Sequence, residues 1–185
     1  MIIVGELINA SRKSVGSAIE NEDVEAVKKL AFDQAENGAD YIDVNAGMFV
    51  GKEAGYLKWL VETVQAAVDK PCSIDSPDPK AIEAALAVHK GIALINSISL
   101  EKERYDALLP IVAGTDLKVV ALCMSDAGMP ETADDRMSIA DKLINGLLQK
   151  NVAVENIYVD PLVQPVATNA KYGVDRKSTR LNSSH

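Results

Sequence analysis

The sequence predicts an α/β fold of parallel strands, a (β/α)8 barrel represented by about six β/α units. Short apolar runs alternate with longer segments of helical period, in unbroken order along the 185 residues. Polar residues recur at the C-terminal end of nearly every apolar run. The first run leads into Gly5-Glu6 and lacks the Gly-x-Gly-x-x-Gly turn of a dinucleotide-binding sheet. The last two observations favour a barrel over an open doubly wound sheet.

The expected strands are short and apolar, as is typical of strands that are buried on both faces. They are Ile2 to Ile8, Tyr41 to Asn45, Cys72 to Asp75, Ile92 to Asn96, Leu117 to Met124 and Ile157 to Asp160.

The expected helices lie between these strands, at about 22–37, 54–69, 79–89, 101–113 and 134–150, with a further one after residue 165. Asn21 is expected to cap the first of them and Gly38 to end it. Asp78 followed by Pro79 predicts the start of the third, because proline is already set to the helical φ angle.

The length of the chain favours the open sheet, because a complete barrel typically takes about 250 residues. The last ten residues offer an explanation. Residues 176–185 are basic and polar, unlike the acidic, alternating sequence before them. We therefore expect residues 1–175 to form an incomplete barrel domain without its last strands and helices, and 176–185 to be a sequencing or vector artefact. A natural, solvated tail is the alternative.

The composition excludes several classes of function. A net charge of −8 and a pI near 4.8 argue against nucleic acid and anionic membranes as partners. No apolar run approaches the roughly 20 residues of a membrane span, and no basic leader precedes the first strand, so we expect a cytoplasmic protein. Cys72 and Cys123 lie far apart and only two histidines occur, so neither a metal site nor a disulfide is expected.

The polar residues at the strand ends are expected to meet at one mouth of the barrel. They are Glu6, Asn9, Asp43, Asn45, Asp75, Ser76, Asn96, Ser97, Met124, Ser125 and Asp160, with methionine as the apolar member. Carboxylates accept paired hydrogen bonds from an amidine-like edge, and carboxamides pair with a neighbouring lactam. A 2-amino-4-oxo pterin ring has this edge. Taken singly, each residue could instead be a turn or a helix cap.

Five short motifs carry a family resemblance. They are Gly-Glu-Leu-Ile-Asn at 5–9, Asp-Val-Asn-Ala-Gly at 43–47, Ser-Ile-Asp-Ser at 73–76, Ile-Asn-Ser at 95–97 and Asp-Pro-Leu at 160–162. In this order and spacing they resemble the methyltetrahydrofolate:corrinoid methyltransferases of the pterin-binding, dihydropteroate synthase-like barrel superfamily. The resemblance extends from residue 1 to about residue 175.

The resemblance implies that Asp75, Asn96 and Asp160 bind the pterin ring as the catalytic set. It also implies that neighbouring groups shape the substrate site, namely Glu6, Asn9, Asp43, Asn45, Ser97 and Met124, although Met124 could equally be a core residue. The substrate would be methyltetrahydrofolate. No Asp-x-His-x-x-Gly segment is present to ligate cobalt, so the corrinoid (cobalamin) is expected on a partner protein. A homodimer is implied by the resemblance alone.

In such enzymes the group that activates N5 is an asparagine in a Gly-Leu-Ser-Asn-like segment, which is absent from these 185 residues. We therefore expect pterin binding without methyl transfer. One alternative is a dihydropteroate synthase, which carries a Ser-Thr-Arg-Pro-like loop after the second strand where this chain has Met-Phe-Val-Gly-Lys at 48–52. The other is a non-catalytic pterin-binding protein.

Overall fold

A computed structural model describes residues 1–163 of the chain in two compact units. The first unit comprises Met1–Ser97, and the second begins at Ile98, so strand β4 (Leu94–Leu100) contributes to both. The helix expected after residue 165 and the segment 176–185 lie outside the described residues.

The strands run parallel and are hydrogen-bonded in the order of the sequence, β1 to β6. Besides β4, they are β1 (Val4–Asn9), β2 (Tyr41–Asn45), β3 (Cys72–Asp75), β5 (Lys118–Ser125) and β6 (Ile157–Asp160). The helices are α1 (Lys13–Glu20), α2 (Val24–Glu36), α3 (Glu53–Ala67), α4 (Pro79–Leu86), α5 (Lys102–Val112) and α6 (Ala133–Leu148), with a short 3₁₀ turn at Val154–Asn156. Parallel strands in this order, each joined to the next through a helical segment, confirm the predicted α/β fold class.

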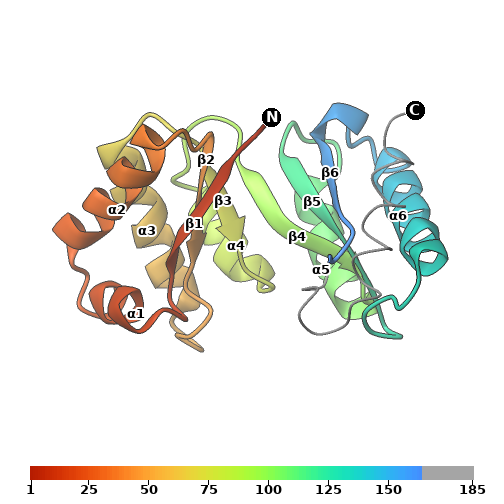
Figure 1. The fold of residues 1–185 in the computed structure, drawn as a ribbon, viewed down its shortest axis with the longest axis horizontal. Coiled ribbons are helices and arrows are strands. Elements are labelled where there is room, and N and C mark those ends of the chain that lie inside the picture. Colours follow the sequence, from red (N-terminus) through yellow and green to blue (C-terminus); the bar gives the residue numbers. More distant parts are fainter. Residues whose placement is uncertain (164–185) are drawn as a thin grey trace. The chain divides into compact units, whose positions relative to one another are not determined.

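The core of the first unit lies between its strands and helices α2, α3 and α4 (Figure 1). Ile42 and Val44 of β2 and Ile74 of β3 are fully buried, as are Leu57 and Leu60 of α3. These side chains alternate along the strands with the polar ones, so one face of the sheet is apolar beneath the helices. The opposite face is left for the polar residues.

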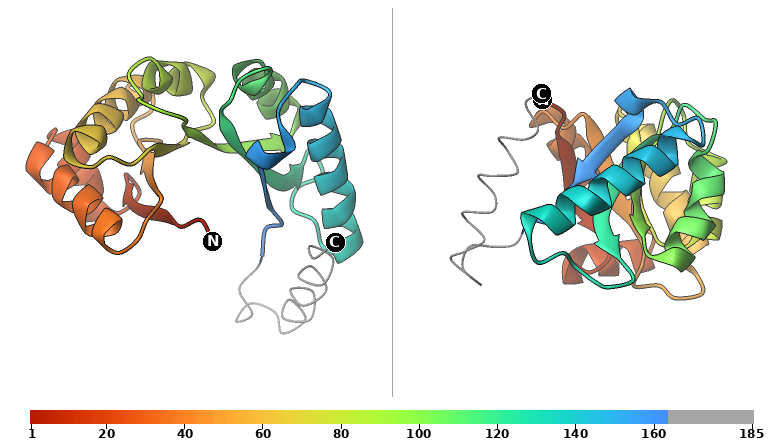
Figure 2. Two further views of the ribbon diagram at one scale, coloured as in Figure 1. Left: turned by 90° about the horizontal axis from the view of Figure 1, so that it is seen from above. Right: turned by 90° about the vertical axis from the view of Figure 1, so that its right-hand side faces the viewer.

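In the second unit, helix α6 packs along β5 (Figure 2). Val119, Ala121 and Cys123 of β5 are fully buried, and Leu143 and Leu147 of α6 are equally inaccessible. Buried and half-buried residues alternate from Lys118 to Met124, which shows that one face of β5 is covered over this length.

The start of the first long helix differs from the prediction. A short helix, α1, precedes it and was not predicted, because it has only eight residues and contains Gly16. Gly16 is needed there, since a Cβ atom would lie 2.5 Å from the Ala10 carbonyl oxygen. The expectation that Asn21 caps α2 is wrong: Asn21 is the C-cap of α1, and Asp23 accepts the capping hydrogen bond from the Ala26 N–H at 3.1 Å.

Two other terminal signals in the first unit are confirmed. Gly38 follows the C-cap of α2 with φ of 92°, a left-handed angle that glycine adopts without strain. Asp78 caps α4 by accepting the Lys80 N–H at 2.9 Å, with Pro79 in the first turn.

Two expectations about the strands are corrected. Strand β4 was expected to end at Asn96 but continues to Leu100, with Ile98 and Ser99 fully buried. The pair Asn96 and Ser97 therefore lies inside the strand. Strand β1 is not buried on both faces, because Glu6 and its neighbour Leu7 are exposed.

His89 fixes the start of β3 from the end of α4. Its Nε2 atom accepts the Cys72 N–H at 2.9 Å, which requires that nitrogen to be unprotonated, and burial lowers the pKa of His89. In the unfolded chain His89 takes up a proton near pH 6.5, whereas in the folded chain it is protonated only at lower pH. Between these two pKa values the unfolded state binds more protons than the folded state. His89 therefore makes the folded state lose stability as the pH falls through this range.

Replacing His89 with alanine is expected to lower the free energy of unfolding at neutral pH by about 1–3 kcal/mol, because the Cys72 N–H loses its acceptor. Urea unfolding measures this difference. His89→Gln is the matched control, since glutamine keeps an acceptor but does not titrate. The loss of stability below about pH 6.5 should then shrink; an unchanged pH dependence would contradict the assignment.

Candidate functional site

Four polar side chains form one row across the first four strands. The strand register aligns Asn9 with Asn45, Asn45 with Asp75, and Asp75 with Asn96. Aligned residues of parallel strands point to the same face of the sheet, with neighbouring strands about 4.8 Å apart. We call this set, Asn9, Asn45, Asp75 and Asn96, the polar row. It belongs entirely to the first unit.

Asp43 and Ser73 form a second layer, two residues earlier on the same face. They are aligned with each other, and the Ser73 hydroxyl donates to Asp43 Oδ2 at 2.6 Å. The Asn96 amide Nδ2 donates to the same oxygen at 3.2 Å. Asp43 is only 3% exposed, so its carboxyl group supports the row from below.

The burial of Asp43 changes its protonation. Desolvation raises its pKa from 3.8 to about 7, against the opposing effect of the hydrogen bonds from Ser73 and Asn96. The negative charges of Asp75 and Glu6 raise the pKa of Asp43 further. The carboxyl group of Asp43 therefore keeps its proton to a higher pH than an exposed aspartate does.

Hydrogen bonds set the direction of two of the three carboxamides in the row, those of Asn45 and Asn96. Asn45 Nδ2 donates to Asp75 Oδ2 at 2.8 Å, while Asn45 Oδ1 accepts the Gly47 N–H at 3.1 Å. Asn96 directs its amide nitrogen at Asp43, so its carbonyl oxygen points away from that carboxyl group. Asp75 and Asn96 are half-buried neighbours. The row thus presents a carboxylate beside a carboxamide oxygen, a pair suited to a ligand edge with N–H donors.

Glu6 and Ser97 are predicted site residues of the first unit outside this row, and Asn9 stands at one end of it. Glu6 is exposed on β1, and Ser97 is buried directly after Asn96. Asn9 is half-buried and accepts the Ser11 N–H at 2.9 Å, so its side chain also shapes the turn after β1.

Glu53 is a residue near this end of the sheet that the sequence did not indicate. Its Oε1 accepts the hydroxyl of Ser76 at 2.5 Å, and Ser76 Oγ in turn accepts the Asp78 N–H at 3.0 Å. This contact links the start of α3 to the loop that follows Asp75. In the sequence, a glutamate in the first turn of a helix is explained by the helix dipole alone.

Asp160 and Met124 lie in the second unit. Asp160 is aligned with Leu122, and Met124 is two residues further along β5, so both side chains belong to the same face. Met124 is half-buried and Asp160 is exposed. Asp160 Oδ1 accepts the Leu162 N–H at 2.8 Å, and its other oxygen has no hydrogen-bond partner among the described residues. The carboxylate thus shapes a turn with one oxygen only.

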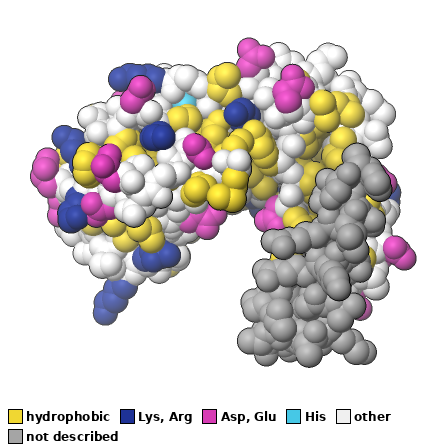
Figure 3. All heavy atoms as spheres, turned by 45° about the horizontal axis from the view of Figure 1, so that its top comes forward, with side chains coloured by type: hydrophobic (Ala, Val, Ile, Leu, Met, Phe, Trp, Pro, Cys, Tyr) yellow, Lys and Arg dark blue, Asp and Glu magenta, His cyan; other side chains and the backbone are white. Residues whose placement is uncertain are grey.

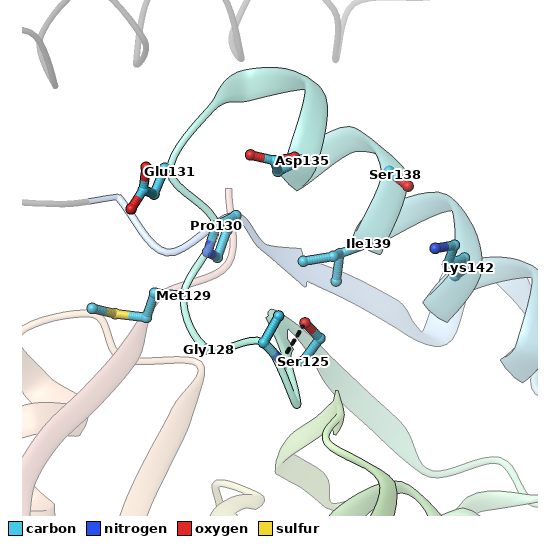
Figure 4. A pocket seen from close by; sticks show the side chains of 10 residues that line it. Ser125, Gly128, Met129, Pro130, Glu131, Asp135, Ser138, Ile139 and Lys142 are labelled. Atoms are coloured by element: carbon cyan, nitrogen blue, oxygen red, sulfur yellow. Dashed lines mark hydrogen bonds between the residues drawn. The ribbon is translucent and has the colours of Figure 1, made fainter.

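The second unit also contains a pocket of about 410 Å³ between the loop after β5 and helix α6 (Figure 4). Ser125 lines it from the end of β5, Met129 and Pro130 from the loop, and Ser138 and Lys142 from the helix. Its lining includes neither Met124 nor Asp160. The pocket is therefore separate from the face that carries those two side chains.

One face of the first unit carries charged side chains of both signs. On the face seen in Figure 3, basic and acidic side chains are interspersed, and Lys29 and Asp33 form an ion pair at 2.6 Å.

Within residues 1–163, no group of three or more histidine, cysteine or acidic side chains is placed to hold a metal ion. Over the same residues, every helix is too short or too polar to cross a bilayer.

Comparison with known proteins gives relatives for nearly the whole chain. A methylcorrinoid:tetrahydrofolate methyltransferase from Eubacterium limosum is 36% identical over 170 residues, which cover 91% of this chain and 63% of that protein. The methionine synthase of Mycobacterium tuberculosis is 28% identical over 176 residues, 91% of this chain and 15% of that one. The chain thus spans less than two thirds of the length of these curated relatives.

The solved structures that resemble this one share its fold. The dihydropteroate synthase of Vibrio fischeri has a TM-score of 0.73 at 17% identity, covering 98% of this chain and 70% of that one. The enzyme from Thermus thermophilus has a TM-score of 0.68 at 19% identity and covers 100% of this chain and 69% of that one. The family described as pterin binding enzyme matches residues 5–176. These residues include the whole polar row and all strand residues of the described part except Val4, and the chain belongs to the pterin-binding enzyme family.

Proposed function

We propose that the polar row binds the pyrimidine edge of a pterin, and that the whole protein is a methyltransferase acting between methyltetrahydrofolate and a corrinoid. The observation that carries the proposal is the alignment of Asp75 with Asn96 on adjacent strands, each holding an acceptor in a fixed direction. The 2-amino-4-oxo edge of a pterin offers the complementary N–H groups.

The roles within the site follow from the contacts. Asp75 and Asn96 accept hydrogen bonds from the ring, and Asn45 holds the Asp75 carboxylate in place. Asp43, being buried, acts through Asn96 and does not contact the ring. Asp160 is the ring contact that we assign to the second unit, on the evidence of its Asp-Pro-Leu motif. We also assign substrate binding to the remaining predicted residues, which are Asn9 of the row, Glu6 and Ser97 elsewhere in the first unit, and Met124 of the second unit.

The relatives favour methyl transfer over dihydropteroate synthesis. The name of the Eubacterium limosum protein gives a methylcorrinoid and tetrahydrofolate as its reactants. Methyl transfer between these reactants makes and breaks the same bonds as the transfer that we propose, whichever direction it takes. The dihydropteroate synthases resemble this chain at 17–20% identity, which establishes the fold alone. From the family resemblance we also propose a cytoplasmic homodimer that receives its corrinoid on a partner protein.

The chemistry places separate demands on the two reactants. A Co(I) corrinoid would supply the nucleophile that takes the methyl group from N5. The bonding electrons return to N5, which needs a proton or a strong hydrogen bond because an amine anion is a poor leaving group. The residues of the polar row hold the ring and fix the direction of N5. We propose that they bind it without activating it, since these 185 residues contain no Gly-Leu-Ser-Asn-like segment.

The test is a binding titration combined with a turnover assay on the full 185-residue chain. We expect 5-methyltetrahydrofolate to bind saturably, while methylcob(III)alamin forms from cob(I)alamin no faster than without protein. Dihydropteroate should not form from a pterin pyrophosphate and 4-aminobenzoate. Absence of pterin binding would overturn the proposed site. Methylcobalamin formation above the uncatalysed rate would overturn the claim of binding without transfer.

A further inference from the structure

The turn that follows β6 has an unusual backbone. Leu162 has φ of 52°, in the left-handed region that a residue with a branched side chain seldom adopts. The turn closes when the Leu162 N–H donates to Asp160 Oδ1 at 2.8 Å. A strained conformation of this kind persists only where the surrounding structure holds it, and such residues gather at ligand sites.

Arg136 of α6 provides that hold. Its side chain is buried, and the residue is only 5% exposed. The Nε atom donates to the Pro161 carbonyl oxygen at 2.9 Å, and Nη2 donates to the Pro130 carbonyl oxygen at 3.2 Å. One guanidinium group thus connects the residue after Asp160 to the loop that leads into α6, where Pro130 is seen in Figure 4.

These contacts direct the Asp160 carboxylate. The peptide group of Pro161 lies between Asp160 and the strained Leu162, so fixing its carbonyl oxygen fixes the orientation of the turn. In the fixed turn, one carboxylate oxygen of Asp160 accepts the Leu162 N–H. This hydrogen bond sets the direction of the other carboxylate oxygen. A planar guanidinium suits this task because it donates in two set directions, whereas the ammonium group of lysine is a single point charge.

We propose that Arg136 is a positioning residue that aims the Asp160 carboxylate at the ligand. This inference rests on the proposed function, because Asp160 is assigned there as a ring contact. If Arg136 served stability alone, its removal would affect ligand binding equally whether or not Asp160 has its carboxylate. A positioning role requires the two residues to be coupled.

A double-mutant cycle with 5-methyltetrahydrofolate as the probe tests this coupling. Arg136→Lys keeps the charge and loses the two-directional geometry. We expect it to weaken binding about 10-fold when Asp160 is present, and less than about 2-fold in the Asp160→Ala background. The control cycle pairs Arg136→Lys with Asp75→Asn. These two substitutions should act independently, so their effects on the dissociation constant should multiply. Circular dichroism establishes that each variant is folded.

If Arg136→Lys does not fold, Leu162→Gly replaces it in the same cycle. Glycine adopts the left-handed conformation without strain, but it also reaches many other conformations, so the turn is no longer confined to one of them. The binding of 5-methyltetrahydrofolate should then again weaken only when Asp160 is present. Equal effects in both backgrounds, or no effect in either, would overturn the inference. The outcome is separate from that of the proposed function, which fails if the unmodified chain does not bind the pterin at all. If Asp75→Asn weakens binding but Asp160→Ala does not, the assignment of Asp160, and with it the role of Arg136, is wrong.

Discussion

Replacing Asp75 with asparagine is expected to weaken the binding of 5-methyltetrahydrofolate by about 10- to 100-fold. The variant keeps the size of the side chain and an oxygen that can accept from Asn45 Nδ2, so the row should remain in place. It removes the negative charge, and a hydrogen bond to a charged group contributes about 1.5–3 kcal/mol. Titration calorimetry or the quenching of ligand fluorescence measures the change in the dissociation constant.

Asp78→Asn is the matched control for this experiment. Asp78 follows the same strand but caps α4 through the Lys80 N–H, and asparagine caps a helix about as well as aspartate does. The dissociation constant of the Asp78→Asn variant for 5-methyltetrahydrofolate should stay within about twofold of the value for the unmodified chain. A twofold change corresponds to much less free energy than the 1.4 kcal/mol of a tenfold change. Equal weakening in Asp75→Asn and Asp78→Asn would mean that strand-end carboxylates act through stability, and the site assignment would be wrong.

Replacing Asp43 with asparagine should remove a pH-dependent loss of stability. In the unfolded chain this carboxyl group ionises near pH 3.8, but in the folded chain it keeps its proton up to about pH 7. Between these values the folded state binds more protons, so its stability falls as the pH rises. Asparagine can accept from Ser73 and Asn96 in the same way as Asp43 does, but it does not ionise.

The stability of Asp43→Asn relative to the unmodified chain should therefore increase by about 2–3 kcal/mol between about pH 5 and about pH 8. Urea unfolding at several pH values measures the difference, and contributions from the other carboxylates cancel because both chains share them. A difference that stays constant over this range would show that Asp43 ionises like an exposed aspartate.

The sequence predicted the strands best where an apolar run ends in a polar residue. Tyr41–Asn45, Cys72–Asp75 and Ile157–Asp160 have the bounds that were expected, because each run is short and strongly apolar. It misplaced the end of β4, since Asn96 resembles a strand end but lies within the strand. It also missed α1, whose stability comes from contacts with the rest of the unit and not from its composition.

The contacts that organise the site could not be predicted from the sequence. Ser73 and Asp43 are 30 residues apart, Ser76 and Glu53 are 23 apart, and Arg136 and Pro161 are 25 apart. Strand-end position indicated which polar residues could meet. Only the strand register showed that Asp43 lies below the row, where it holds Asn96 and is itself nearly inaccessible.

The central claim is that the polar row recognises the 2-amino-4-oxo edge of a pterin through fixed acceptors. Two ring systems that differ only at this edge test it directly, namely pterin and lumazine, in which a carbonyl oxygen replaces the 2-amino group. A carboxylate that accepts from the amino group of pterin would face an oxygen in lumazine and repel it. Titration of the full chain should show pterin binding at least about 10-fold more tightly than lumazine. Equal affinity for the two rings would contradict the account.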